Sequence, residues 1–105
     1  NICITRAGAS TLAELVYLNI PHIAIPLPTA RDNHQYENAI FYQEYGCNWI
    51  MEQKEINEKS FMDKIVSIIK NKEEYLNKKR NMKNFNLKNT WNYINQKIIE
   101  TINEN

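Results

Sequence analysis

The segment TRAGASTLAE, residues 5–14, joins a short apolar run to an amphipathic one and contains Gly8, one of only two glycines in the 105-residue chain. The residues before it, NICIT at 1–5, are mostly apolar and β-branched, which predicts a buried strand. From Thr11 the apolar residues recur every three to four positions, which predicts a helix. A strand that turns directly into a helix either only redirects the chain or offers unpaired helix amides to an anion.

The alternation of strand and helix continues to residue 51. The first helix should stop near Asn19, because asparagine tolerates the left-handed conformation of a C-terminal cap. Further apolar runs predict strands at 22–26 and 47–51, and Gly46 should end the helix between them. The exposed-loop residues Asp32 and Asn33 are suitable N-caps for that helix. Its shared face is predicted to carry Tyr36, Ala39, Ile40 and Gln43.

The second half of the chain has helical periodicity and no further strand pattern. One helix should begin at Ser60, a charged and more exposed helix should cover about residues 72–80, and a last helix should begin near Thr90. These helices are expected to cover the face and edge of the sheet. Their apolar stripes are Phe61, Ile65, Ile68 and Ile69 in the first, and Trp91, Ile94, Ile98 and Ile102 in the last.

Short connections between alternating strands and helices are typical of right-handed parallel βαβ units. The predicted fold is therefore α/β, a partial Rossmann-like parallel sheet (βαβαβ) followed by C-terminal helices. Three parallel strands are few for an open sheet, so further strands are expected upstream of Asn1.

Composition excludes several classes of function. Thirteen basic and twelve acidic residues give a net charge of +1, which provides no electrostatic case for a nucleic-acid or anionic-membrane partner. No apolar run approaches the length of a bilayer span, and the expected setting is cytoplasmic. Cys3 and Cys47 lie inside predicted strands and suit apolar packing rather than a disulfide. His22 is predicted to be packed in a strand, and two distant histidines without cysteine partners predict no metal site.

The corner at Gly8 has two readings. Small residues at Ala7, Ala9 and Ser10 leave its amides accessible to a phosphate, and Glu14, one turn into the helix, could accept hydrogen bonds from the two hydroxyls of a ribose. Alternatively, Thr11 caps the helix and forms a capping box with Glu14 three residues later, which is a purely structural role.

The loop before the second helix contains His34, Gln35 and Asn38. Neutral amides both donate and accept hydrogen bonds, as the recognition of sugar hydroxyls requires. Asp32 and Gln35 also have the spacing of a cap, so Gln35 could be structural. His34 has no serine, cysteine or acidic partner at a spacing that predicts a catalytic set.

Three motifs carry a resemblance to a known family: RAGASTLAEL at 6–15, NIPHIAIPLP at 19–28 and DNHQYENA at 32–39. In order and spacing they closely resemble the C-terminal domain of the MurG-type GT-B transferases of glycosyltransferase family 28. These bacterial enzymes move N-acetylglucosamine from its UDP donor onto lipid I to form lipid II in peptidoglycan synthesis. The match is dense over residues 1–51 and looser beyond.

The resemblance implies a site for UDP-N-acetylglucosamine. Residues 9–11 would lie against the diphosphate and sugar, Glu14 would hold the ribose, and Gln35 would contact the sugar hydroxyls. His34 and Asn38 would line or brace the pocket, while Arg6 matches the motif arginine without a defined role. Asn19 stands where a glycine is usual in the family, and Asn33 stands where the family also uses aspartate. The full implied set is Gly8, Ala9, Ser10, Thr11, Leu12, Ala13, Glu14, His34, Gln35 and Asn38.

The resemblance also implies that residues 1–105 are the C-terminal portion of a donor-binding domain. The acceptor domain, with the catalytic base, the lipid I site and the peripheral contact with the cytoplasmic face of the inner membrane, is expected in an absent N-terminal part. No residue here is then catalytic, no metal or other cofactor is needed, and this piece alone should be inactive. The alternatives are a subunit of another GT-B UDP-sugar transferase and a non-catalytic half-domain.

Overall fold

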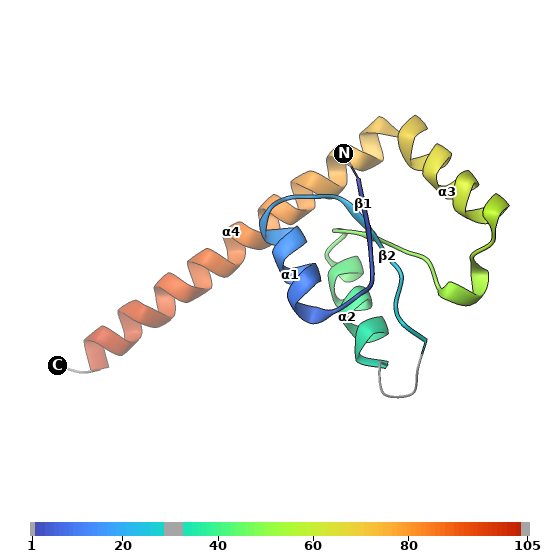
Figure 1. Cartoon of the computed structure of the whole chain (residues 1–105). Helices are drawn as coiled ribbons and strands as arrows, with labels where there is room; N and C mark the ends of the chain where they lie inside the picture. The colour runs from blue at the N-terminus through green and yellow to red at the C-terminus, as the bar shows by residue number, and fades with distance from the viewer. Residues whose placement is uncertain (1, 29–32, 104–105) are drawn as a thin grey trace.

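Three short parallel strands form the sheet in the computed structural model, which describes residues 2–28 and 33–103 (Figure 1). The strands are β1 (Cys3–Thr5), β2 (His22–Ala24) and β3 (Trp49–Ile50), in the order β1-β2-β3. Ile4 pairs with Ile23, and Ile23 pairs with Trp49. The predicted parallel βαβαβ arrangement is confirmed, and each strand is shorter than its apolar run.

Helices cover both faces of the sheet. On one face lie α1 (Ala9–Tyr17) and α2 (Asn33–Glu44), and on the other lies α3 (Glu58–Lys70), which follows the 3-10 turn η2 (Gln53–Glu55). The last helix, α4 (Lys72–Asn103), packs against α1 and α3 and then projects beyond the sheet (Figure 1).

Alternation along the strands sends successive side chains to opposite faces. Ala24 packs with Leu12 of α1 and Ala39 of α2. On the opposite face, Ile23 and Trp49 pack with Ile68 of α3. Met82 of α4 joins Val16 and Cys47 in a third buried group. The first group comprises Ala7, Leu12, Ala24 and Ala39, and the second comprises Ile23, Trp49, Met51 and Ile68.

Both predicted left-handed helix ends are confirmed. Asn19 has φ 58° after α1, and Gly46 has φ 72° after α2. At Gly46 a Cβ atom would lie 2.5 Å from Asn81 Nδ2, which donates a hydrogen bond to the Gly46 carbonyl at 3.0 Å. Glycine is therefore required here both by its backbone conformation and by the close approach of α4.

Three helix boundaries differ from prediction. The first helix begins at Ala9 rather than Thr11. The third begins at Glu58 rather than Ser60, because Asn57 and Ser60 form a capping box that starts the helix earlier. The predicted cap at Asp32 lies outside the described residues, and Asn33 is the first residue of α2.

The predicted face of α2 is wrong in part. Ala39 is fully buried as expected, but Tyr36 and Gln43 are exposed. The side that packs inward instead carries Gln35, Asn38 and Tyr42, because two of these side chains bond to the backbone of the first corner. Hydrogen bonding, which apolar periodicity ignores, sets this rotation of the helix.

The last two predicted helices are a single helix. No glycine or proline occurs after Gly46, so nothing interrupts α4 between Lys72 and Asn103. Its C-terminal part does not cover the sheet. Trp91, expected to pack, is 59 % exposed, whereas Trp49 is buried and donates from Nε1 to Glu74 Oε1 at 2.8 Å.

The two cysteines are free thiols. Cys47 is buried, and its burial raises the pKa of the thiol to about 11, so it is inert at neutral pH. Cys3 is partly buried on the edge strand β1. Within the described ranges, no helix is long and apolar enough to cross a membrane.

His22 is fully buried, as predicted, at the start of β2. Its Nδ1 lies 3.0 Å from the Ile20 carbonyl and donates to it, while Nε2 has no partner among the described residues. In the same part of the chain, the Oδ1 atom of the buried Asn48, just before β3, also lacks a donor. Burial lowers the pKa of His22 because the imidazolium form would lose its hydration.

This burial predicts a pH-dependent stability. Below about pH 6.5 the unfolded chain binds a proton at His22 that the folded chain takes up only at lower pH. The free energy of unfolding should therefore fall as the pH is lowered from about 7. His22→Leu, which is similar in volume, should remove this slope in urea unfolding followed by tryptophan fluorescence. His34→Gln, a change at an exposed side chain, should keep it; an unchanged slope in His22→Leu would contradict the assignment.

Candidate functional site

The first corner presents bare helix amides to solvent. Gly8 is the N-cap of α1, so no side chain caps the helix, and the first turn contains no acidic residue. Leu12 N–H bonds to the Gly8 carbonyl at 3.0 Å. Within the described part of the chain, no group accepts from the amides of Ala9, Ser10 or Thr11, and all three residues are exposed. This end of the helix can therefore bind an anion.

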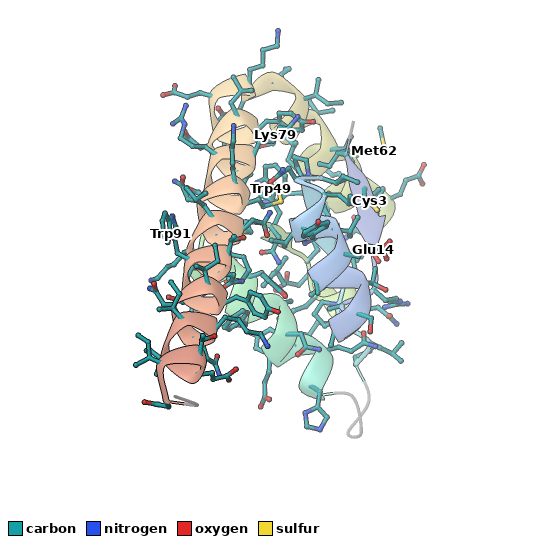
Figure 2. The ribbon with its side chains drawn as sticks, turned by 90° about the vertical axis from the view of Figure 1, so that its left-hand side faces the viewer. Cys3, Glu14, Trp49, Met62, Lys79 and Trp91 are labelled. Carbon is teal, nitrogen blue, oxygen red and sulfur yellow. The ribbon has the colours of Figure 1, made fainter. Side chains whose placement is uncertain are left out.

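The capping-box alternative is wrong. Because α1 begins at Ala9, Thr11 lies inside the first turn and Glu14 is the sixth helical residue, too far along for its side chain to reach the N-cap amide. Glu14 is exposed on α1 (Figure 2). No described residue forms an ion pair or side-chain hydrogen bond with it. Its carboxylate is free to accept hydrogen bonds.

Gly8 adopts a backbone conformation that does not need glycine. Its φ of −64° and ψ of 142° are open to any residue, and a Cβ atom there would meet only Thr11 Oγ1 at 3.9 Å. The turn itself does not require glycine. Its absent side chain matters only for access to the adjacent amides.

Two side chains of α2 hold the corner from behind. Gln35 Oε1 accepts from Ala7 N–H at 3.3 Å and from Leu27 N–H at 2.9 Å. Asn38 Nδ2 donates to the Ala7 carbonyl at 3.3 Å. We call this arrangement the Ala7 clamp, because it fixes both polar groups of the Ala7 residue and ties the first loop to the second. Within the described residues, Gln35 Nε2 has no partner and remains available as a donor.

Arg6 braces the carboxyl end of the sheet. Its Nη1 donates to Gln53 Oε1 at 2.7 Å and reaches the Ile25 carbonyl at 3.5 Å. The guanidinium thus links the ends of all three strands, because Gln53 follows β3. Sequence reasoning missed Gln53; the available signal was its place after the third strand, since the carboxyl ends of parallel strands share one edge.

A hollow of about 410 Å³ adjoins this brace. It lies at the carboxyl end of the sheet, where open α/β sheets bind their ligands. Its walls combine three isoleucines with three polar residues, Thr5, Arg6 and Gln53. The lining residues are Ile4, Thr5, Arg6, Ile25, Gln53 and Ile56.

The other predicted site residues do not share one surface. His34 is exposed at the start of α2, with Nδ1 3.9 Å from a carboxylate oxygen of Glu37. Leu12 is fully buried, so its side chain belongs to the core and not to a binding surface. Ala13 faces a different groove, beside Tyr17 and Tyr42. Among the residues described, no group of three or more histidine, cysteine, aspartate or glutamate side chains could hold a metal ion.

The arrangement suits binding rather than bond cleavage. Free amides and the positive end of the α1 dipole can stabilise a phosphate, and the Glu14 carboxylate one turn later can accept from hydroxyls. Gln35 Nε2 adds a neutral donor held in place by the Ala7 clamp. An anion linked to a polyhydroxyl group is the ligand that these groups match.

Comparisons with known proteins agree with this chemistry. Residues 1–94 match the model of the glycosyltransferase family 28 C-terminal domain. The chain is 65 % identical over its whole length to a Pelagibacter ubique protein named UDP-N-acetylglucosamine--N-acetylmuramyl-(pentapeptide) pyrophosphoryl-undecaprenol N-acetylglucosamine transferase, of which it covers 30 %. Proteins of the same name from Rickettsia bellii and Rickettsia prowazekii are 43 % and 47 % identical over 78 % and 70 % of the chain, or 23 % and 19 % of their own lengths. No solved structure matches.

The chain therefore spans less than a third of the length of these curated relatives. The family match covers both the corner at Gly8 and the Ala7 clamp. By this match the chain belongs to the glycosyltransferase family 28 C-terminal domain family.

Proposed function

We propose that this chain is the donor-binding part of an inverting hexosyltransferase that moves N-acetylglucosamine from UDP-N-acetylglucosamine to lipid I, forming lipid II in peptidoglycan synthesis. The observation that carries the proposal is the uncapped, exposed start of α1 with a free carboxylate one turn later. The names of the relatives support the donor and the undecaprenol-linked acceptor. A lipid-linked acceptor also supports a location of the whole protein at the cytoplasmic face of the inner membrane.

In this proposal the amides of Ala9, Ser10 and Thr11 bind the diphosphate. Negative charge grows on the diphosphate as the bond to the sugar breaks, and fixed amide dipoles stabilise that charge without reorganisation. No metal or other cofactor is assigned to this role. Gly8 leaves the approach to these amides open. The backbone of Leu12 and Ala13, the next residues of α1, is proposed to line the same site.

Glu14 is proposed to accept hydrogen bonds from the ribose hydroxyls. Gln35 is proposed to donate from Nε2 to the sugar, with His34 beside it, while Asn38 is a positioning residue that acts through Ala7. None of these groups is assigned a catalytic role. The base that activates the acceptor is proposed to lie in the part of the protein that this chain does not include.

Glu14→Ala should weaken binding of UDP-N-acetylglucosamine by about 10- to 100-fold, because a charge-assisted hydrogen bond is worth about 1.5–3 kcal/mol. The measurement is calorimetry on the protein at the full length of its relatives. Glu44→Ala, which removes another exposed carboxylate at the end of α2, is the matched control and should bind normally. Equal donor affinity in the two variants would remove the physical basis of the proposal.

Gln35 allows its structural and ligand roles to be separated. Gln35→Ala leaves the Ala7 and Leu27 amides without their acceptor and should lower the free energy of unfolding by about 1–3 kcal/mol. Gln35→Glu keeps an acceptor oxygen and should preserve stability. It replaces the Nε2 donor, however, and should reduce affinity for UDP-N-acetylglucosamine more than affinity for UDP.

The comparison with UDP is the control for charge. A new carboxylate that acted only by repelling the diphosphate would weaken both ligands equally, and this result would argue against a contact between Gln35 and the sugar. Turnover with lipid I, measured as UDP release with and without the acceptor, tests the acceptor assignment separately.

A further inference from the structure

Two asparagines of α4 hold the far ends of the two helices that carry the candidate site. Asn86 Nδ2 donates to the Val16 carbonyl at 2.9 Å, in the last turn of α1. The same atom lies 3.4 Å from the Tyr17 carbonyl. Asn81 Nδ2 donates to the Gly46 carbonyl at 3.0 Å, just after the end of α2. We call Asn81 and Asn86 the α4 anchors.

Both anchors bond where a helix has carbonyl groups to spare. The last four carbonyls of an α-helix have no amide partner within the helix, so groups from elsewhere in the fold can bind them. Val16 is buried, and its carbonyl accepts from Asn19 N–H as well as from Asn86. Each anchor therefore fixes the position of a helix end without breaking any bond inside that helix.

The same side of α4 packs against both helices. Met82 is fully buried beside Val16. The Phe85 ring meets the rings of Tyr42 and Tyr45, at the end of α2, edge to face with centroids 5.6 and 4.9 Å away. Met82 and Phe85 are next to the anchors in the sequence, so one side of α4 supplies the apolar and the polar contacts. Together they hold α4 in one defined position against α1 and α2.

At their other ends, α1 and α2 are joined by the Ala7 clamp. Gln35 and Asn38, near the start of α2, bond to Ala7, two residues before α1 begins. Both helices run toward α4, which crosses their far ends (Figure 1). They are thus fastened twice, to each other at the site and to α4 at the opposite end.

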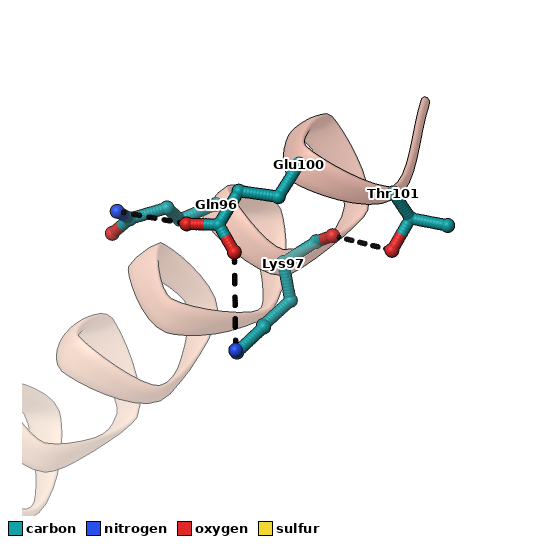
Figure 3. Close-up of polar contacts among 4 residues, drawn as sticks. All are labelled: Gln96, Lys97, Glu100 and Thr101. Carbon is teal, nitrogen blue, oxygen red and sulfur yellow. Dashed lines mark hydrogen bonds and ion pairs between the residues drawn. The ribbon is translucent and has the colours of Figure 1, made fainter. Parts of the chain in front are cut away.

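Polar contacts near the end of α4 are of a different kind. Glu100 accepts from Gln96 Nε2 at 3.5 Å, and its carboxylate lies 3.8 Å from Lys97 Nζ (Figure 3). These bonds join residues of the same helix and stabilise α4 itself. The α4 anchors differ, because each reaches a helix that carries predicted site residues.

Small rotations at the anchored ends would be enlarged at the site. α1 has nine residues and α2 has twelve, which correspond to lengths of about 14 and 18 Å. A rotation of about 3° at the end of α2 would then move its first residue by roughly 1 Å. A displacement of about 1 Å is enough to weaken the hold on a reacting group.

We propose that Asn81 and Asn86 are positioning residues for the nucleotide-sugar donor. They set the separation between the Glu14 carboxylate on α1 and the Gln35 Nε2 group on α2. This inference rests on the proposed function, in which those two groups bind the ribose and the sugar of one ligand. Neither asparagine touches the ligand, and each acts through the helix that it holds.

Binding of UDP to the protein at the full length of its relatives tests Asn86. Asn86→Ala should weaken this binding about 2- to 30-fold, as expected for coupling through packed elements. Asn86→Ser, which keeps a shorter donor, should have a smaller effect in the same direction. In the Glu14→Ala protein, Asn86→Ala should weaken binding less than it does in the wild type, because it acts through Glu14. Losses that simply multiply would overturn the proposal.

Asn81 is tested by the sugar. Asn81→Ala should lower the affinity for UDP-N-acetylglucosamine more than the affinity for UDP, because α2 carries Gln35. The matched control is Asn84→Ala, which changes an exposed asparagine of the same helix and should bind both ligands normally. Equal affinities of the Asn81→Ala and Asn84→Ala proteins for UDP-N-acetylglucosamine would overturn the role of Asn81.

Hydrogen exchange without ligand distinguishes positioning from general stability. Asn81→Ala should speed exchange in peptides that contain the Ala7 and Leu27 amides, which Gln35 holds, more than in peptides of the sheet. A uniform increase over the whole domain would show a purely structural role and overturn the proposal.

The donor measurements also separate this proposal from the proposed function. A wild-type protein that does not bind UDP-N-acetylglucosamine would overturn both. Weak binding by Glu14→Ala beside normal binding by Asn81→Ala and Asn86→Ala would overturn only the role of the α4 anchors.

Discussion

The Ala7 clamp is the contact on which the candidate site depends. Two hydrogen bonds from α2 hold the Ala7 backbone, and α1 starts two residues later with its amides toward solvent. Without the clamp, the corner would be free to rotate and the amides of Ala9–Thr11 would not share a fixed direction. An anion site made of backbone has no side chain to adjust, so its geometry must be set from outside. Gln35 and Asn38 supply that constraint.

The same logic explains why this site requires little charge. Arg6, the basic side chain that precedes the corner in the sequence, is engaged by Gln53 and the Ile25 carbonyl. Positive potential at the corner therefore comes from the helix end rather than from a side chain. This suits a group whose charge changes during a reaction, because fixed dipoles need no movement to respond.

Much of the fold could be predicted from the sequence, and the failures have physical causes. The strands and the left-handed residues Asn19 and Gly46 follow from local apolar runs and backbone preferences, which act over a few residues. The capping box at Thr11 was a false match, because the spacing that predicts it also occurs inside a helix that begins earlier. The bond between Arg6 and Gln53 joins residues 47 positions apart, which no local pattern encodes. For α4, the absence of glycine and proline after Gly46 already indicated an unbroken helix. Its stripe of apolar residues does not indicate what covers them.

Asn86 gives the long helix a further consequence. Its Nδ2 donates to the Val16 carbonyl at 2.9 Å, near the end of α1, so the helix that carries the corner is fastened at its far end to α4. Because α4 runs unbroken for 32 residues, or about 48 Å, it transmits orientation as a stiff rod. Whatever fixes the tilt of that rod also fixes the angle at which the corner meets an incoming molecule.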